Sequence, residues 1–289
     1  MKISGFTIIR NAIINDYPAV EAIRSILPVV DEMIVSIGKS DDDTEGLIRS
    51  IDSSKIKIVH SEWDLSKLPG GKVMAIETDK AFKQISPEST WAFYIQCDEV
   101  VHEQYHAAIT KACNDYKDQS EVLGLVFNYV HFYGTYDYYG NSRQWYNKEI
   151  RIIRNDSRIS SYRDAQGFRM DGKRLPCKLI DASMYHYGWV KNPKLMDHKL
   201  RNLSKNWMGN EMKKRIDSIE GVFNYDDYDS MEIFKGTHPQ VMEKRIGEKN
   251  WTVDIDVTRK KFTTKKWIMY LLEKLTGKRL FSFRNFEII

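Results

Sequence analysis

The chain has 289 residues, 42% of them apolar and 29% charged, a balance that buries a core without disulfides or a structural metal. A net charge of +4 suits an enzyme with anionic substrates but is too small for a dedicated nucleic-acid-binding protein. The three cysteines are an odd number without close pairing, which favours reduced thiols in a cytosolic compartment over a secreted disulfide framework.

Strand and helix signals alternate in the N-terminal part of the chain. Short apolar runs predict strands over 3–10, 32–37, 56–60 and 91–96. Apolar residues at helical spacing predict helices within 11–26, 45–51, 72–84 and 104–116. Such alternation predicts an α/β fold in which helices cover both faces of a mostly parallel sheet.

The pattern changes in the second part of the chain. Apolar runs over 122–133 and 149–154 predict two more strands. The Tyr-, Gly- and Asn-rich segment between them, 134–147, is interpreted as a long functional loop, because its aromatic content argues against disorder. Spaced apolar residues further on indicate helices. We therefore predict a catalytic domain over 1–190 and a mainly helical C-terminal region over 191–289.

Polar side chains follow each of the four predicted parallel strands. Ligands bind at the carboxyl ends of the strands in such a sheet, so these side chains should converge on one edge. They are Arg10 and Asn11, the segment 36–43, Glu62 and Asp64, and the segment 97–99.

Asp98 is the most informative of these residues. It directly follows an apolar strand, where a carboxylate is poorly placed unless it binds a ligand, caps a helix or pairs with a cation. Carboxylate oxygens are natural ligands of the Mg²⁺ or Mn²⁺ that neutralises a sugar diphosphate, and Glu99 and Glu103 could add further oxygens. The structural alternative makes Asp98 a helix N-cap, with Glu99 in the first turn.

The ordered motifs IIRNA, VSIGKSDDDTEGLI, a helix led by Gly-Gly, and FYIQCDEVV resemble the nucleotide-binding half of family-2 glycosyltransferases, which have the GT-A fold. The resemblance covers roughly residues 3–190 and is carried by the order of the motifs. It departs from the family where Gln96 or Cys97 replaces the first acidic residue of the metal motif, and where Ser36-Ile37-Gly38 ends the second strand.

The resemblance implies an inverting transfer from a nucleotide-diphosphate sugar to a saccharide or lipid-linked acceptor, assisted by Mn²⁺ or Mg²⁺. It also implies that the nucleotide-sugar contacts Arg10, Asn11, Asp42, Asp43, Lys72 and Asp98. A histidine late in the catalytic domain completes the metal site in many such enzymes, and His186 in YHYGW is similar in placement. The alternative is a histidine hydrogen-bonded in an aromatic core, and the nearby Trp189 either stacks on a sugar or is buried.

An inverting transfer also needs a carboxylate base for the acceptor hydroxyl. The resemblance places this base at about Asp164, with Asp171 and Glu149 as alternatives, while the plain expectation for each is a solvated side chain. Arg151 and Arg154 could hold phosphates or face solvent along an edge strand.

The C-terminal segment 258–286 interleaves basic residues with Trp, Tyr, Leu and Phe. Such a segment lies on an anionic membrane surface or packs as a terminal helix against its own domain. No stretch approaches the ~20 apolar residues of a membrane span, and the N-terminus has no signal-peptide pattern. We expect a cytoplasmic protein, with any membrane contact at the inner face through this segment.

Two other functions remain open at this point. A nucleotidyltransferase also uses a carboxylate and a metal at a sheet edge, but it would carry a Gly-rich basic loop after the first strand, where this chain has Arg10-Asn11-Ala12. A non-catalytic carbohydrate- or nucleotide-binding protein of the same fold is compatible with the altered metal motif.

Overall fold

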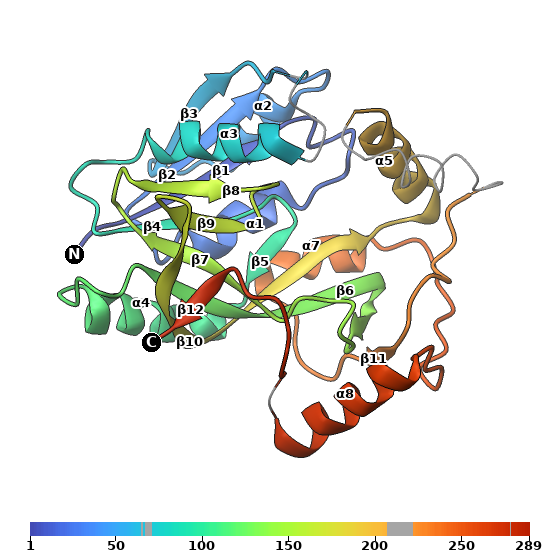
Figure 1. The fold of residues 1–289 in the computed structure, drawn as a ribbon. Coiled ribbons are helices and arrows are strands. Elements are labelled where there is room, and N and C mark those ends of the chain that lie inside the picture. Colours follow the sequence, from blue (N-terminus) through green and yellow to red (C-terminus); the bar gives the residue numbers. More distant parts are fainter. Residues whose placement is uncertain (65, 67–70, 207–221, 278) are drawn as a thin grey trace.

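The computed structural model describes residues 1–64, 66, 71–206, 222–277 and 279–289. Its N-terminal half contains the strands β1 (Ile3–Ile9), β2 (Glu32–Gly38), β3 (Ile56–Ser61) and β4 (Trp91–Tyr94). The helices between them are α1 (Ala19–Ile26), α2 (Thr44–Arg49) and α3 (Lys72–Phe82). The strands run parallel in the order β3-β2-β1-β4, which confirms the predicted α/β alternation (Figure 1).

Further strands extend this sheet and make it mixed. They are β5 (Glu99–Val101), β6 (Gly124–Gly140), β7 (Lys148–Arg154), β8 (Ile159–Tyr162), β9 (Gly167–Met170) and β10 (Lys173–Val190). The main path over the described residues is β3-β2-β1-β4-β7-β6-β10-β9-β8. Strand β7 pairs antiparallel with both β4 and β6 and is therefore a central strand. The expectation of an edge strand at this position is wrong.

The C-terminal part contributes both helices and strands. Its helices are α5 (Pro193–Asn206), α7 (Glu243–Gly247) and α8 (Thr264–Thr276), with a short 3-10 helix, η4 (Gln240–Met242). Strands β11 (Met231–Ile233) and β12 (Phe286–Ile288) pair with β6 and β10, so this part joins the same sheet. The predicted boundary after residue 190 coincides with the end of β10 and stays a prediction.

The predicted long loop over 134–147 is wrong for its first half. Strand β6 continues to Gly140, and only 141–147 lies outside the strands. The extension is possible because β11 pairs with Tyr138 to Gly140 and satisfies backbone groups that a loop would expose to water. This partner follows about ninety residues later in the sequence, so local patterns could not indicate it.

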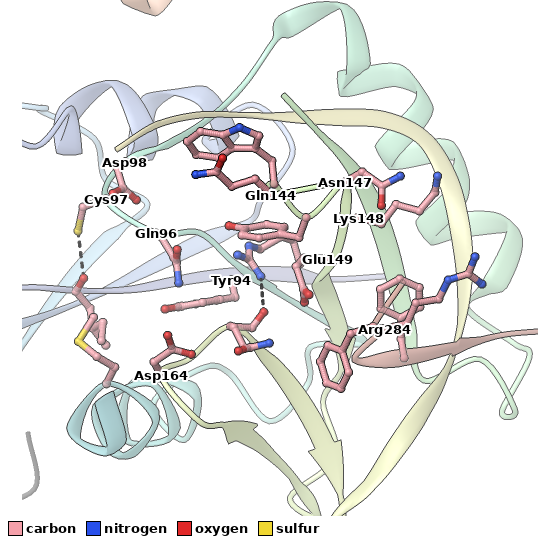
Figure 2. Close-up of a pocket in the computed structure, with 18 of the residues that line it drawn as sticks. Tyr94, Gln96, Cys97, Asp98, Gln144, Asn147, Lys148, Glu149, Asp164 and Arg284 are labelled. Carbon is pink, nitrogen blue, oxygen red and sulfur yellow. Dashed lines mark hydrogen bonds between the residues drawn. The ribbon is translucent and has the colours of Figure 1, made fainter. Parts of the chain in front are cut away.

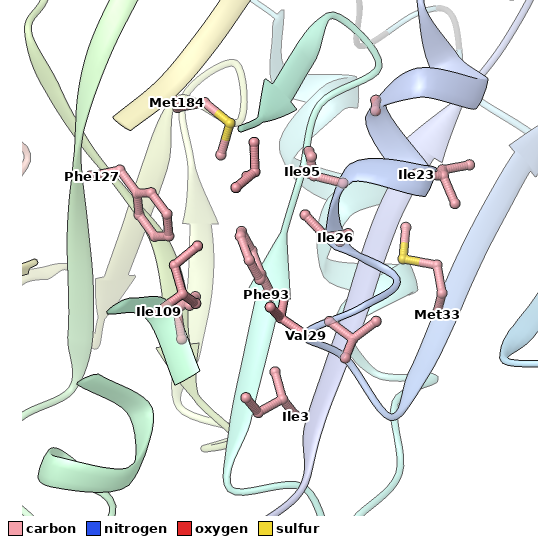
Figure 3. Packing of buried hydrophobic residues seen from close by; sticks show 14 of the residues in the cluster. Ile3, Ile23, Ile26, Val29, Met33, Phe93, Ile95, Ile109, Phe127 and Met184 are labelled. Atoms are coloured by element: carbon pink, nitrogen blue, oxygen red, sulfur yellow. The ribbon is translucent and has the colours of Figure 1, made fainter. Parts of the chain in front are cut away.

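Apolar side chains fill both faces of the sheet. On one face, Ile23 of α1 and Ile109 of α4 (His106–Tyr116) belong to one buried cluster with Phe93 and Phe127 of the sheet (Figure 3). On the other face, a second cluster includes Phe82 of α3. Full burial of one such side chain contributes about 1.5–3 kcal/mol, so these layers hold the parallel strand ends at one edge.

Candidate active site

A large cavity opens at the carboxyl ends of β1 and β4. Its volume is about 1410 Å³, above the ~300–1,000 Å³ usual for small-molecule pockets. The N-terminal half lines it with Arg10, Asn11, Asp41 and Asp98, and the segment 143–149 contributes further side chains (Figure 2). The predicted convergence of strand-end residues is therefore confirmed for β1, β2 and β4.

The pairing of β5 with β10 brings Asp98 to His186. Glu99 lies opposite His186 in this antiparallel pair, and the Tyr187 N–H donates to the Asp98 carbonyl at 2.8 Å. Asp98 Oδ1 consequently lies 3.7 Å from His186 Nε2. The alternative of Asp98 as a helix N-cap is wrong, because β5 follows it and His102 caps the next 3-10 helix, η3 (Glu103–Tyr105).

Basic side chains surround the Asp98 carboxylate. The Lys199 ammonium from α5 lies 3.8 Å from Asp98 Oδ2 and donates to the Gly188 carbonyl at 2.9 Å. Burial raises the pKa of Asp98, but His186, Lys199 and the buried Lys191 outweigh it and bring the pKa below its ordinary value. The carboxylate is therefore ionised at neutral pH. Lys199 has no local sequence signal, because its contact with Asp98 depends on how α5 docks.

His131 sets the tautomer of His186. The His131 Nε2 donates to the carbonyl of Tyr146 at 2.7 Å, because a carbonyl only accepts. Burial lowers the pKa of His131 well below its ordinary value, so the ring is neutral and its Nδ1 has a lone pair. His186 Nδ1 donates to this atom across 3.2 Å. A neutral His186 then has a lone pair on Nε2, the atom nearest Asp98.

Asp98 and His186 fit a divalent cation that is shared with substrate phosphates. A carboxylate and an imidazole are both ligands for Mn²⁺, and Mg²⁺ is usually held by one or two carboxylates plus phosphate oxygens. A Cβ on Gly188 would lie 2.6 Å from Asp98 and 2.8 Å from His186 Nε2, so only glycine leaves space here. In the part of the chain described, no three His, Cys, Asp or Glu side chains are placed around one ion. Such a cation would therefore depend on substrate oxygens.

Asp41 is the carboxylate of the second-strand turn that lines the cavity. Asn11 holds it with two hydrogen bonds. The Asn11 side-chain amide donates to Asp41 Oδ2 at 3.0 Å, and the Asp41 backbone N–H donates to Asn11 Oδ1 at 2.8 Å. Arg10 donates to the Lys39 carbonyl at 2.8 Å and lies 3.5 Å from Asp41. The Asp41 side chain is nevertheless 70% exposed and can accept further hydrogen bonds.

The other predicted donor-binding residues lie elsewhere. Asp42 accepts from two backbone N–H groups of the loop after β1, at 3.0 and 2.8 Å, and ties that loop to the turn after β2. Asp43 caps α2 and accepts from a first-turn N–H at 2.9 Å. Lys72 begins α3 with an exposed side chain and does not belong to the cavity lining.

Glu149 is a second buried carboxyl group in the cavity lining. It is 6% exposed, and Asn285 donates to its Oε1 at 3.1 Å. Its Oε2 has no hydrogen-bond partner among the described residues. Burial raises the pKa of Glu149 to about 7, against the lowering effect of the nearby Arg151. A carboxyl group with this pKa exchanges protons at neutral pH.

The other two predicted bases differ in position. Asp164 lines the same cavity with an exposed side chain, where its Cβ would lie 2.4 Å from a Cβ built on Gly71. Asp171 lies in the turn between β9 and β10 and is not part of the lining. The structure therefore brings Asp98, Glu149 and Asp164 together and leaves Asp171 outside.

Several side chains that the sequence offered as metal, phosphate or sugar contacts stabilise the fold instead. Glu99 is fully buried and pairs with both ends of the Arg151 guanidinium, at 2.7 and 2.8 Å. Arg154 donates to carbonyls around the end of α4 and lies 4.0 Å over the Trp91 ring. Glu99 is thus no metal ligand, and neither arginine is a free phosphate ligand. Trp189 packs against an aromatic cluster and is likewise outside the cavity lining.

No protein-family model and no curated protein sequence matches this chain. Among solved structures, it is similar to S. aureus TarS 1-349 at 15% identity and TM-score 0.40, over 71% of this chain and 65% of that one. It is also similar to 4-diphosphocytidyl-2C-methyl-D-erythritol synthase from Anaerococcus prevotii at 14% identity and TM-score 0.40, over 68% of this chain and 94% of that one.

A third similar structure is glucosyl-3-phosphoglycerate synthase from Mycobacterium tuberculosis, solved with Mn²⁺, UDP and phosphoglyceric acid. It has 18% identity and TM-score 0.31, over 45% of this chain and 43% of that one. Likeness at this level concerns the fold alone.

Proposed function

We propose that this protein is a glycosyltransferase that moves a sugar from a UDP- or GDP-sugar to an acceptor hydroxyl with inversion. One observation carries the proposal. An ionised carboxylate, Asp98, lies beside the Nε2 lone pair of His186 and the ammonium of Lys199, at the carboxyl edge of parallel strands in a cavity of about 1410 Å³.

The donor would lie along the edge formed by β1, β2 and β4. Asp41, positioned by Asn11, would accept hydrogen bonds from the N–H or hydroxyl groups of the nucleoside. Asp98 and His186 would hold Mn²⁺ or Mg²⁺ against the diphosphate. When bound, this ion neutralises the charge that develops on the departing nucleotide. Lys199 adds a permanent donor at the same place.

Glu149 is the base that the geometry favours. Its side chain belongs to the cavity lining, and its pKa of about 7 would let it take a proton from an acceptor hydroxyl at neutral pH. Asp164, the residue indicated by the sequence resemblance, lines the same cavity and is the second candidate base. The acceptor is a saccharide or a lipid-linked saccharide.

The test is nucleotide release. Wild type, Asp98→Asn and Asp171→Asn are incubated with UDP- and GDP-sugars, with Mn²⁺ or with a chelator, and free UDP or GDP is measured. We expect metal-stimulated release from one donor class, lost by about a thousandfold in Asp98→Asn. Asp171→Asn is the matched control, since Asp171 lies outside the cavity lining, and it should behave as wild type.

Two results would contradict the proposal. If no nucleotide-sugar stabilises the wild type in thermal unfolding and none is cleaved at any metal concentration, the chain is no glycosyltransferase. If donors bind with the expected dependence on Asp98 but are never cleaved, with or without acceptors, the non-catalytic binding protein is correct.

A further inference from the structure

Helix α8 exposes its apolar side chains to solvent. A helix on the surface of a globular protein normally turns its apolar stripe to the core. In α8, the side chains of Ile268, Leu271 and Leu275 are 56%, 52% and 83% exposed, and no residue of the helix is buried. The expectation that this helix packs its stripe against its own domain is wrong.

Ion pairs explain how the helix is held this way. Glu273 contacts Arg143 and Arg279, each at 3.0 Å, and Lys266 reaches Asp229 at 3.1 Å. The side of α8 that carries Lys266 and Glu273, together with the half-buried Met269 and Tyr270, therefore faces the rest of the protein. Figure 1 shows the helix at the foot of the molecule, set apart from the body of the sheet.

The apolar surface continues beyond the helix. Leu280, Phe281 and Phe283 are 42%, 91% and 60% exposed. The same three residues line the cavity, together with Glu273. The wall of the proposed active site and the exposed apolar surface are therefore one continuous segment of chain.

Positive charge is concentrated in the same segment. Residues 258–289 contain nine basic and two acidic residues, a net charge of +7. The other 257 residues contain 35 basic and 38 acidic residues, a net charge of −3. The excess of positive charge in the whole protein thus comes from the segment that exposes the leucines and phenylalanines.

We infer that α8 and the following segment to Arg284 form a docking surface for an anionic lipid bilayer. Leucine and phenylalanine side chains would enter the boundary between head groups and acyl chains, while exposed basic side chains such as Lys265 and Arg284 would contact lipid phosphates. A second copy of the chain fits less well, because a symmetric contact through this surface would bring two segments of net charge +5 together. No helix in the described residues is long and apolar enough to cross a membrane, so the contact is peripheral.

The inference also specifies the acceptor. Because Phe281 and Phe283 belong to both the cavity wall and the docking surface, the cavity opens at the level of the lipid head groups. An acceptor saccharide linked to a lipid would enter it without leaving the bilayer. This step rests on the proposed glycosyl transfer, whereas the docking surface does not.

Vesicle sedimentation tests the surface with the full chain. Vesicles of phosphatidylcholine alone are compared with vesicles that also contain phosphatidylglycerol. Wild type should partition at least about tenfold better into the anionic vesicles, with an affinity that falls as salt is raised. Ile268→Ser combined with Leu275→Ser should weaken this binding at least about tenfold, because both side chains lose their apolar contact.

Controls separate the possible outcomes. Ile13→Ser removes a side chain that is 50% exposed but lies in the N-terminal half, and it should leave vesicle binding unchanged. Release of UDP or GDP from water-soluble donors should be equal in wild type and the Ile268/Leu275 variant, so a failure of docking is distinguishable from a failure of catalysis. Wild type that ignores anionic vesicles, or a variant that binds them as well as wild type, overturns the inference. So does a wild-type dimer in solution that the same variant dissociates.

Discussion

Two carboxyl groups in one cavity have opposite surroundings. Asp98, at the end of the parallel half, is enclosed by the basic side chains of His186, Lys199 and Lys191, and these neighbours lower its pKa although burial alone would raise it. Glu149, on β7, is also buried but has one amide partner, and its pKa rises to about 7. Burial acts in the same direction on both groups, so the neighbouring charges decide the difference.

This difference separates two chemical roles at neutral pH. A carboxylate that stays ionised can hold a cation or orient a positively charged group, whereas one that titrates near neutrality can accept and return a proton. The position of each group sets its role. Asp98 directly precedes β5, which pairs with β10, and it lies near Lys199 of α5, while Glu149 on β7 lies against Asn285 near the end of the chain.

The largest expected effect comes from Glu149→Gln. If Glu149 is the base, kcat should fall by about 10² to 10⁴, while KM for the donor stays close to the wild-type value. Steady-state kinetics with acceptor present measures both. Asp164→Asn is the parallel variant. A large loss of kcat in Asp164→Asn with little loss in Glu149→Gln would assign the base to Asp164.

The same substitution should stabilise the fold at high pH. The pKa of Glu149 is raised in the folded state from 4.5 to about 7, so the protonated group is favoured there. The contribution of protonated Glu149 to the free energy of unfolding is therefore fully present below pH 4.5 and is lost as pH rises through 7. Glu149→Gln removes this loss and should gain up to about 3 kcal/mol at pH 8, with little change at pH 4. Urea unfolding of wild type and Glu149→Gln at pH 4 and pH 8 measures this difference. An equal change in the free energy of unfolding at both pH values would contradict a raised pKa of Glu149.

Gly188→Ala tests the crowded side of the cavity. The new methyl group would lie within 2.8 Å of both Asp98 and His186, so one of these side chains must move. Metal stimulation of nucleotide release should shift to metal concentrations about 10- to 100-fold higher. Gly247→Ala is the control, because its Cβ meets no atom within 4 Å. An unchanged metal titration would show that Asp98 and His186 do not act together on a cation.

The smallest expected effect concerns the nucleoside. Asp41→Asn should raise the dissociation constant of UDP or GDP by about tenfold, because a charged acceptor is replaced by a neutral one. Asp43→Asn should leave this constant unchanged, since that side chain caps α2. Calorimetric titration measures the dissociation constant of UDP or GDP for both variants. Weaker binding by Asp43→Asn, with unchanged binding by Asp41→Asn, would favour the predicted contact with Asp43.

The orientation of helix α8 depends on ion pairs with residues that are distant in the sequence. From the sequence, the interleaved Lys, Trp and Leu of α8 fit both a packed helix and a membrane-facing one. The choice follows from Glu273, whose partners Arg143 and Arg279 turn its side of the helix inward. One partner lies well over a hundred residues away along the chain, so periodicity alone gives no sign of it.

The parallel half of the fold was readable from the sequence, because apolar runs and helical spacing are local properties and alternation requires parallel strands. The same logic placed Asp98, Arg10 and Asn11 at one edge. Local patterns carry no information on which distant side chains meet. The neighbours of Asp98, the pKa of Glu149 and the outward stripe of α8 were therefore set only when strand register and helix docking brought distant charges within a few ångströms.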